Sequence, residues 1–105
     1  MNDVTPFQID PKYFSVLNPE LSLQQAIYHR QEQMISFQFD YANKNNHSYV
    51  SFDFGYNPSE GTLIPDALCI PHDITETQTR TLKQNMTEIA QNQTICDVVR
   101  NSLRQ

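Results

Sequence analysis

Two stretches of the chain alternate between apolar and polar residues, as neighbouring strands of an antiparallel β-sheet do. The apolar residues occupy every second position, which places them on one face of a strand. They are Ile35, Phe37, Phe39 and Tyr41 in the first stretch and Val50, Phe52, Phe54 and Tyr56 in the second. The sequence therefore predicts a β-hairpin with strands at about 34–42 and 48–56.

The turn of this hairpin determines which residues oppose each other. Asn45 and Asn46 lie between the two stretches, and asparagine tolerates the positive φ angles that a two-residue turn requires. A turn centred on them gives the opposed pairs Tyr41–Val50, Phe39–Phe52, Phe37–Phe54 and Ile35–Tyr56. A lone hairpin is marginal in water, so the aromatic face must pack on other elements, for which helices are the expected choice.

Helices are predicted on both sides of the hairpin. Residues 18–20 read Asn-Pro-Glu, which is typical of a helix start, and predict a helix at about 19–32 that buries Leu23 and Ile27. Two helices are predicted at about 74–92 and 95–104, because the apolar stripe shifts by about half a turn between them. Their candidate capping boxes are Asp73–Glu76, Thr75–Gln78 and Thr94–Asp97.

The segment from Thr62 to Pro71 is apolar apart from one charge at Asp66. Its two prolines argue against a central strand along its whole length, so only a short third, edge strand is predicted near 67–70. Together these elements predict a single domain at 1–105 of the α+β class, in which the hairpin packs against helices.

Composition and charge narrow the classes of partner. The net charge is −5, with seven basic and twelve acidic residues scattered along the chain, so nucleic acid is not an expected partner. The sequence has no apolar run of membrane-spanning length, so we expect no membrane partner. It also shows no secretory signal, so we expect a cytoplasmic location. Cys69 and Cys96 are then expected to be reduced thiols.

Several enzyme classes lack their signatures. The chain contains only Gly55 and Gly61, whereas phosphate loops and the dinucleotide fingerprint need several glycines at fixed spacing. The G-x-S-x-G motif of hydrolases is also missing. We therefore expect no nucleotide-binding fold of these types and no cofactor.

Three residue combinations could still carry chemistry. Cys69 and His72 have a C-x-x-H spacing, but a structural zinc site needs a second such pair, so no metal ligands are predicted. Cys69 as a nucleophile would need His72 as its base, with an aspartate such as Asp73 to orient it. Asp40 and Asp53 become diagonal neighbours in the predicted register, about 7–8 Å apart at Cα, which overlaps the spacing of paired catalytic carboxylates.

These observations favour a small acidic protein-binding module without enzymatic activity, of the inhibitor, immunity, adaptor or chaperone-like kind. A small enzyme using Cys69/His72 or Asp40/Asp53 and a structural metal-binding domain are the alternatives. The predicted partner is a protein of unknown identity, with a homodimer through an unpaired strand edge as one form of it. The candidate binding residues are Tyr49, Leu63, Ile64, Leu68 and Ile70.

Overall fold

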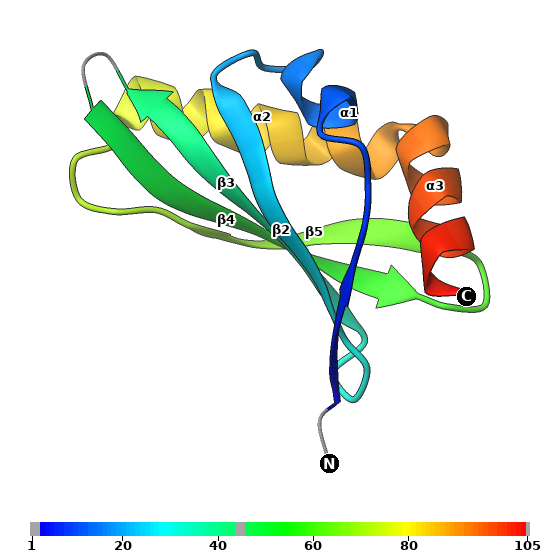
Figure 1. Cartoon of the computed structure of the whole chain (residues 1–105). Coiled ribbons are helices and arrows are strands. Elements are labelled where there is room, and N and C mark those ends of the chain that lie inside the picture. The colour runs from blue at the N-terminus through cyan, green and yellow to red at the C-terminus, as the bar shows by residue number, and fades with distance from the viewer. Residues whose placement is uncertain (1–2, 44–45, 105) are drawn as a thin grey trace.

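In the part of the chain that the structure describes, five strands form one antiparallel sheet, and their order in space follows their order in the sequence (Figure 1). The computed structural model describes residues 3–43 and 46–104. The strands are β1 (Val4–Phe7), β2 (Leu21–His29), β3 (Met34–Asn43), β4 (Asn46–Asn57) and β5 (Thr62–Cys69). The predicted α+β class and the predicted hairpin, which is β3–β4, are confirmed.

The register of β3 and β4 differs by two residues from the prediction. The observed pairs are Ile35–Phe54, Phe37–Phe52, Phe39–Val50 and Tyr41–Ser48. Asn46 opposes Asn43 as a strand residue, while Asn45, the other half of the predicted turn, lies outside the described residues. A shift of two residues leaves every side chain on its original face, so the alternation alone could not separate these two registers.

The predicted helix at 19–32 is wrong, because residues 21–29 form strand β2. A bulge between Leu23 and Gln25 moves the alternation by one residue. The core-facing positions of β2 are therefore Leu21, Leu23, Ala26 and Tyr28. The pattern no longer has a period of two, and the four-residue spacing of Leu23 and Ile27 resembles that of a helix. Ile27 lies on the other face of the sheet, opposite Ser36.

Asn18 is a turn residue where the sequence suggested a helix cap. Its side-chain oxygen accepts a hydrogen bond from the Glu20 backbone N–H at 3.0 Å. Its side-chain amide donates to the Asn85 side-chain oxygen, also at 3.0 Å, and both side chains are buried. The turn before β2 is thereby tied to a helix 67 residues further along the chain.

Within residues 3–43 and 46–104, three helices cover one face of the sheet. They are α1 (Lys12–Ser15), α2 (Glu76–Gln91) and α3 (Gln93–Leu103). The two predicted C-terminal helices are confirmed, and their starts are set by a Thr75–Gln78 capping box and by the Asn92 side chain, which accepts from the Ile95 N–H. The Asp73–Glu76 and Thr94–Asp97 boxes are not the caps that form.

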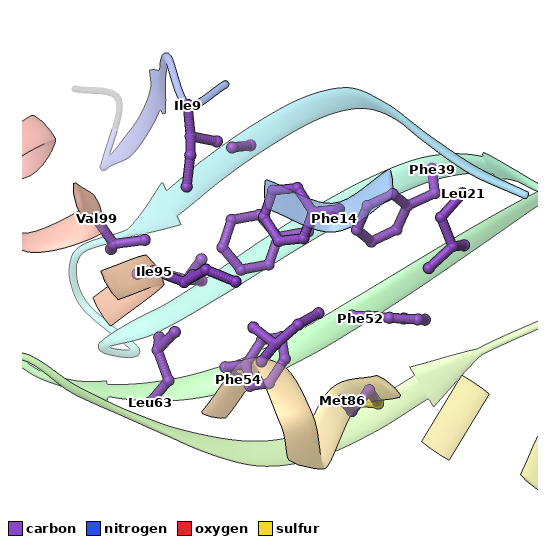
Figure 2. Packing of buried hydrophobic residues seen from close by; sticks show 14 of the residues in the cluster. Ile9, Phe14, Leu21, Phe39, Phe52, Phe54, Leu63, Met86, Ile95 and Val99 are labelled. Carbon is purple, nitrogen blue, oxygen red and sulfur yellow. The ribbon is translucent and has the colours of Figure 1, made fainter. Parts of the chain in front are cut away.

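The core lies between these helices and the aromatic face of β3 and β4 (Figure 2). Phe14 of α1 inserts into it, with its ring centroid 4.9 Å from that of Phe37 and 5.3 Å from that of Phe39. The helices α2 and α3 contribute Leu82, Met86, Ile89, Ile95 and Val99. All three helices therefore lie on the same side of the sheet.

Gly61, between β4 and β5, offers a test of this fold. Its φ is +69°, and a Cβ added there would lie 2.8 Å from Cδ of Arg100. We expect Gly61→Ala to lower the free energy of unfolding by about 1–2 kcal/mol, because L-residues are disfavoured in this conformation. Gly55→Ala is the matched control, since a Cβ there meets nothing closer than 3.9 Å, and it should change stability by less than about 0.5 kcal/mol. Urea denaturation would measure both, and an equal loss in the two variants would contradict this account.

Candidate functional site

The described helices leave the opposite face of the sheet uncovered (Figure 1). We call it the open face. Its central positions on β3, β4 and β5 are Ser36, Gln38, Asp40, Tyr49, Ser51, Asp53, Gly55, Ile64, Ala67 and Cys69. Most of these side chains are small or polar, and the two large hydrophobic ones that are exposed on this face are Tyr49 and Ile64.

Asp53 organises the centre of the open face. Its carboxylate accepts hydrogen bonds from the hydroxyls of Ser36 at 2.8 Å and Ser51 at 3.1 Å. The Cys69 thiol donates to the other carboxylate oxygen, with 3.9 Å between sulfur and oxygen. Burial and, after it, the neighbouring charge of Asp53 raise the pKa of the Cys69 thiol. A raised pKa keeps the thiol protonated, which is the reverse of what activates a nucleophile.

The structure does not assemble the catalytic group predicted around Cys69. His72 is exposed beyond the end of β5, and no hydrogen bond joins it to Cys69 within the part of the chain that the structure describes. Asp73 instead accepts a hydrogen bond from the Ser48 hydroxyl at 3.0 Å. Among residues 3–43 and 46–104, no three His, Cys, Asp or Glu side chains are grouped so that they could hold a metal ion.

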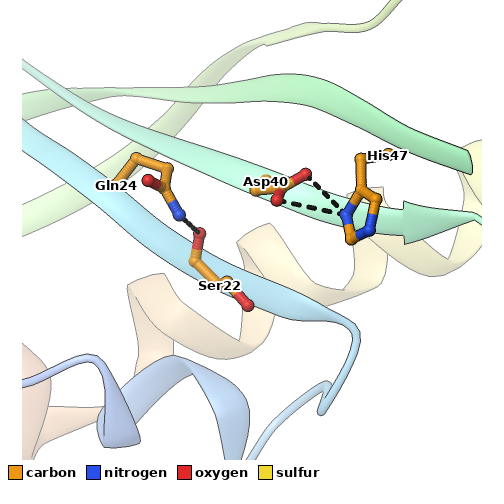
Figure 3. Close-up of polar contacts among 4 residues, drawn as sticks. All are labelled: Ser22, Gln24, Asp40 and His47. Carbon is orange, nitrogen blue, oxygen red and sulfur yellow. Dashed lines mark hydrogen bonds and ion pairs between the residues drawn. The ribbon is translucent and has the colours of Figure 1, made fainter.

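Asp40 and Asp53 are also further apart than predicted. In the observed register Asp40 opposes Tyr49 and Asp53 opposes Ser36, so the two residues are four positions apart along the strands, which is about 13 Å of strand length. Asp40 instead contacts His47, whose Nδ1 lies 3.1 Å from a carboxylate oxygen (Figure 3). The predicted carboxylate pair is therefore absent, because it depended on the register that proved wrong.

The five residues predicted to bind a partner fall into two groups. Tyr49 is 80% exposed and Ile64 is 62% exposed, and both lie on the open face. Leu63 is only 5% exposed and belongs to the core, while Leu68 and Ile70 are half-buried against it. The alternation within β5 explains the contrast between Leu63 and Ile64, which are neighbours in sequence and point to opposite faces.

A shallow cavity of about 370 Å³ adjoins Tyr49 on the open face. Gln38, Tyr49, Val50, Ser51, Cys69 and Ile70 line it. The sequence suggested Tyr49 and Ile70 but gave no sign that Gln38 and Cys69 would join them. That grouping depends on the pairing of β3, β4 and β5, which only the correct register supplies.

The outer edge of β1 carries a proline where strand addition would need an N–H. Successive residues of an antiparallel strand direct their backbone groups to opposite sides. The Arg30 N–H donates to the Asp3 carbonyl at 3.0 Å, so Thr5, two residues after Asp3, also bonds to β2. Pro6 is the next residue after Thr5, so its backbone groups point the other way and its nitrogen faces away from the sheet.

The outer edge of β5 has the same feature. The Tyr56 N–H donates to the Gln33 carbonyl at 2.8 Å, so the backbone groups of Phe54, two residues earlier, also point toward β3. Pro65 is the residue of β5 opposite Phe54, and its nitrogen therefore points away from β4, toward the outer edge. This orientation explains how β5 passes through Pro65 and extends over Thr62–Cys69, well beyond the predicted 67–70. A bulge next to Pro65 and side chains of α2 beside β5 further obstruct this edge. Edges of this kind are typical of sheets that resist pairing with another chain.

Comparisons with known proteins found no matching family model, no matching curated protein and no matching solved structure. None of the helices in the described ranges combines the length and the hydrophobicity needed to cross a membrane.

The contact between Cys69 and Asp53 predicts a measurable change in thiol reactivity. Replacing Asp53 with Asn removes the negative charge that helps to raise the pKa of Cys69, so the pKa should fall and more thiolate should form near pH 8. We expect iodoacetamide to alkylate Cys69 severalfold faster in Asp53→Asn, as followed by mass spectrometry of the intact protein. Asp40→Asn removes the same charge at a greater distance and should leave the rate unchanged. A rate that does not respond to Asp53→Asn would contradict the assigned contact.

Proposed function

We propose that this chain is a non-enzymatic protein-binding module that docks a partner protein on its open face, around Tyr49. The exposure of Tyr49 is the observation that carries the proposal, because a tyrosine that is 80% exposed beside a cavity is a ready interface anchor. Tyrosine buries a large ring on binding and still offers a hydroxyl for hydrogen bonding. An inhibitor, immunity, adaptor or chaperone-like role in the cytoplasm is the corresponding biological expectation.

The shape of the open face supports this proposal. Between Tyr49 and Ile64 the β4 and β5 side chains on the open face are the small ones of Ser51, Gly55, Ala67 and Cys69, and Asp53, whose carboxylate is hydrogen-bonded within the sheet. Tyr49 and Gly55, the residue opposite Ile64, are six residues apart on β4, which is about 20 Å along the strand. Two large exposed side chains thus flank a low surface that a partner segment of several residues could cover. Such an arrangement resembles an interface in which a few bulky anchors act around small neighbours.

The face is a better docking surface than the strand edges. Pairing through an edge requires free N–H groups, and both edges present a proline nitrogen at an outward position. We therefore favour contact through side chains of the open face over a homodimer formed by strand addition. The enzyme alternative has less support, because Cys69 pairs with Asp53 and the two aspartates of the open face lie apart.

Photo-crosslinking in the producing cell would test the proposed surface. We expect a chain with p-benzoylphenylalanine at position 49 to form a covalent adduct with one protein, because the probe would lie inside the interface. The same probe at position 16 is the matched control, since Val16 is 79% exposed in the segment that follows α1. Adducts that are absent at position 49, or that form equally at both positions, would contradict the proposal. An adduct of the chain with itself would identify the partner as a second copy.

A further inference from the structure

The open face is uneven in charge. At its strand positions within the described residues it carries two carboxylates, Asp40 and Asp53, two histidines, His29 and His47, and no lysine or arginine. The helical layer holds most of the basic residues of the chain, namely Lys12, Arg80, Lys83, Arg100 and Arg104. Among the described residues, a partner that covers the strand positions of the open face therefore meets these two carboxylates and two histidines, and no lysine or arginine.

The two carboxylates differ in the number of hydrogen bonds that they already accept. Asp53 accepts from two hydroxyls and a thiol. Asp40 contacts His47, which is itself 71% exposed, and the Asp40 side chain is 30% exposed. Asp40 thus retains room and acceptor capacity for a further donor, whereas Asp53 is held within the sheet.

Asp40 lies directly across from Tyr49. The hydrogen bond from the Tyr56 N–H to the Gln33 carbonyl shows that the odd-numbered residues of β3 direct their backbone groups toward β4. The backbone groups of the even-numbered residues, such as Asp40, therefore point away from β4. In such a non-bonded pair the Cα atoms are about 4.5 Å apart and the side chains are close. Asp40 and the exposed Tyr49 therefore occupy adjacent positions on the open face, and Tyr49 lines the cavity.

We infer that the partner presents a basic side chain, arginine above all, to the pair formed by Asp40 and Tyr49. This inference rests on the proposed function and identifies the chemistry of the partner at the same surface. A guanidinium forms charge-assisted hydrogen bonds with a carboxylate and stacks on an aromatic ring. The neighbouring cavity lined by Ile70 and Cys69 accepts an apolar side chain adjacent to that arginine. The occupant is thus a protein segment in which an arginine stands next to an apolar residue.

Titration with a short peptide, followed by two-dimensional amide NMR spectroscopy of the whole chain, tests this inference. The probe is acetyl-leucyl-arginine amide, and acetyl-leucyl-citrulline amide is its neutral counterpart of nearly the same shape. We expect saturable shifts confined to residues 38–40, 49–51 and 69–70, with affinity in the millimolar range. Citrulline should bind at least about fivefold more weakly, because it lacks the charge. Raising the salt concentration should weaken the binding of the arginine peptide and leave that of the citrulline peptide unchanged.

Variants separate a local effect from a change in net charge. Asp40→Asn and Tyr49→Ala should each weaken the binding of the arginine peptide at least about threefold. Asp97→Asn removes the same charge from an exposed position on α3 and should leave binding unchanged. His47→Ala should not weaken binding, because it frees Asp40 from its present contact.

The outcomes distinguish this inference from the proposed function. Equal binding of the two peptides, shifts elsewhere on the chain, or no binding of either peptide at about 20 mM would overturn the inference. A photo-crosslink from position 49 in the same circumstances would leave the docking surface in place with a partner that is not basic. Loss of that crosslink would remove both.

Discussion

The aromatic face shared by β3 and β4 is the constraint on which the rest of the structure depends. Phe37, Phe39, Phe52 and Phe54 have no solvent exposure, and their rings pack on one another across the two strands, with centroids 4.9 Å apart for Phe39–Phe52. Burying four such rings requires cover, which α2 and α3 supply from the C-terminal third and α1 supplies by inserting Phe14. Because the helices of the described residues all pack on this face, none of them covers the opposite face. The location of the proposed docking surface thus follows from where the core lies.

Much of this arrangement could be predicted, and the failures share one physical cause. Alternation identifies which face a residue occupies, so the aromatic core, the outward position of Asp53 and the exposure of Tyr49 follow from the sequence. Alternation does not reveal a shift by two residues, which is why the pairing of Asp40 with Asp53 was wrong. A bulge hides alternation altogether, which is why β2 resembled a helix at Leu23 and Ile27. Neither a register nor a bulge is visible in one strand alone, since both are properties of a pair.

The prolines show how a residue can carry different information in sequence and in structure. In the sequence, Pro65 argued against a strand through 62–70, because a proline cannot donate to a ladder. In the structure its nitrogen faces outward, where no donor is needed and where its absence hinders another chain from pairing. Pro6 occupies the equivalent position on β1. Each edge of the described sheet therefore carries an outward proline nitrogen, which disfavours the addition of another strand.

The open face itself divides into a structural part and an available part. Around Asp53, two serine hydroxyls and the Cys69 thiol satisfy the carboxylate, and burial, together with the charge of Asp53, raises the pKa of that thiol. Around Asp40, the exposed His47 is the contact to the carboxylate, and the Tyr49 ring stands open to solvent. A polar group that is fully hydrogen-bonded inside a sheet gains little from a partner, whereas one beside an exposed ring gains both a hydrogen bond and a stacking surface. This difference is why we place recognition at Tyr49 and Asp40 and treat Asp53 as part of the framework that holds them.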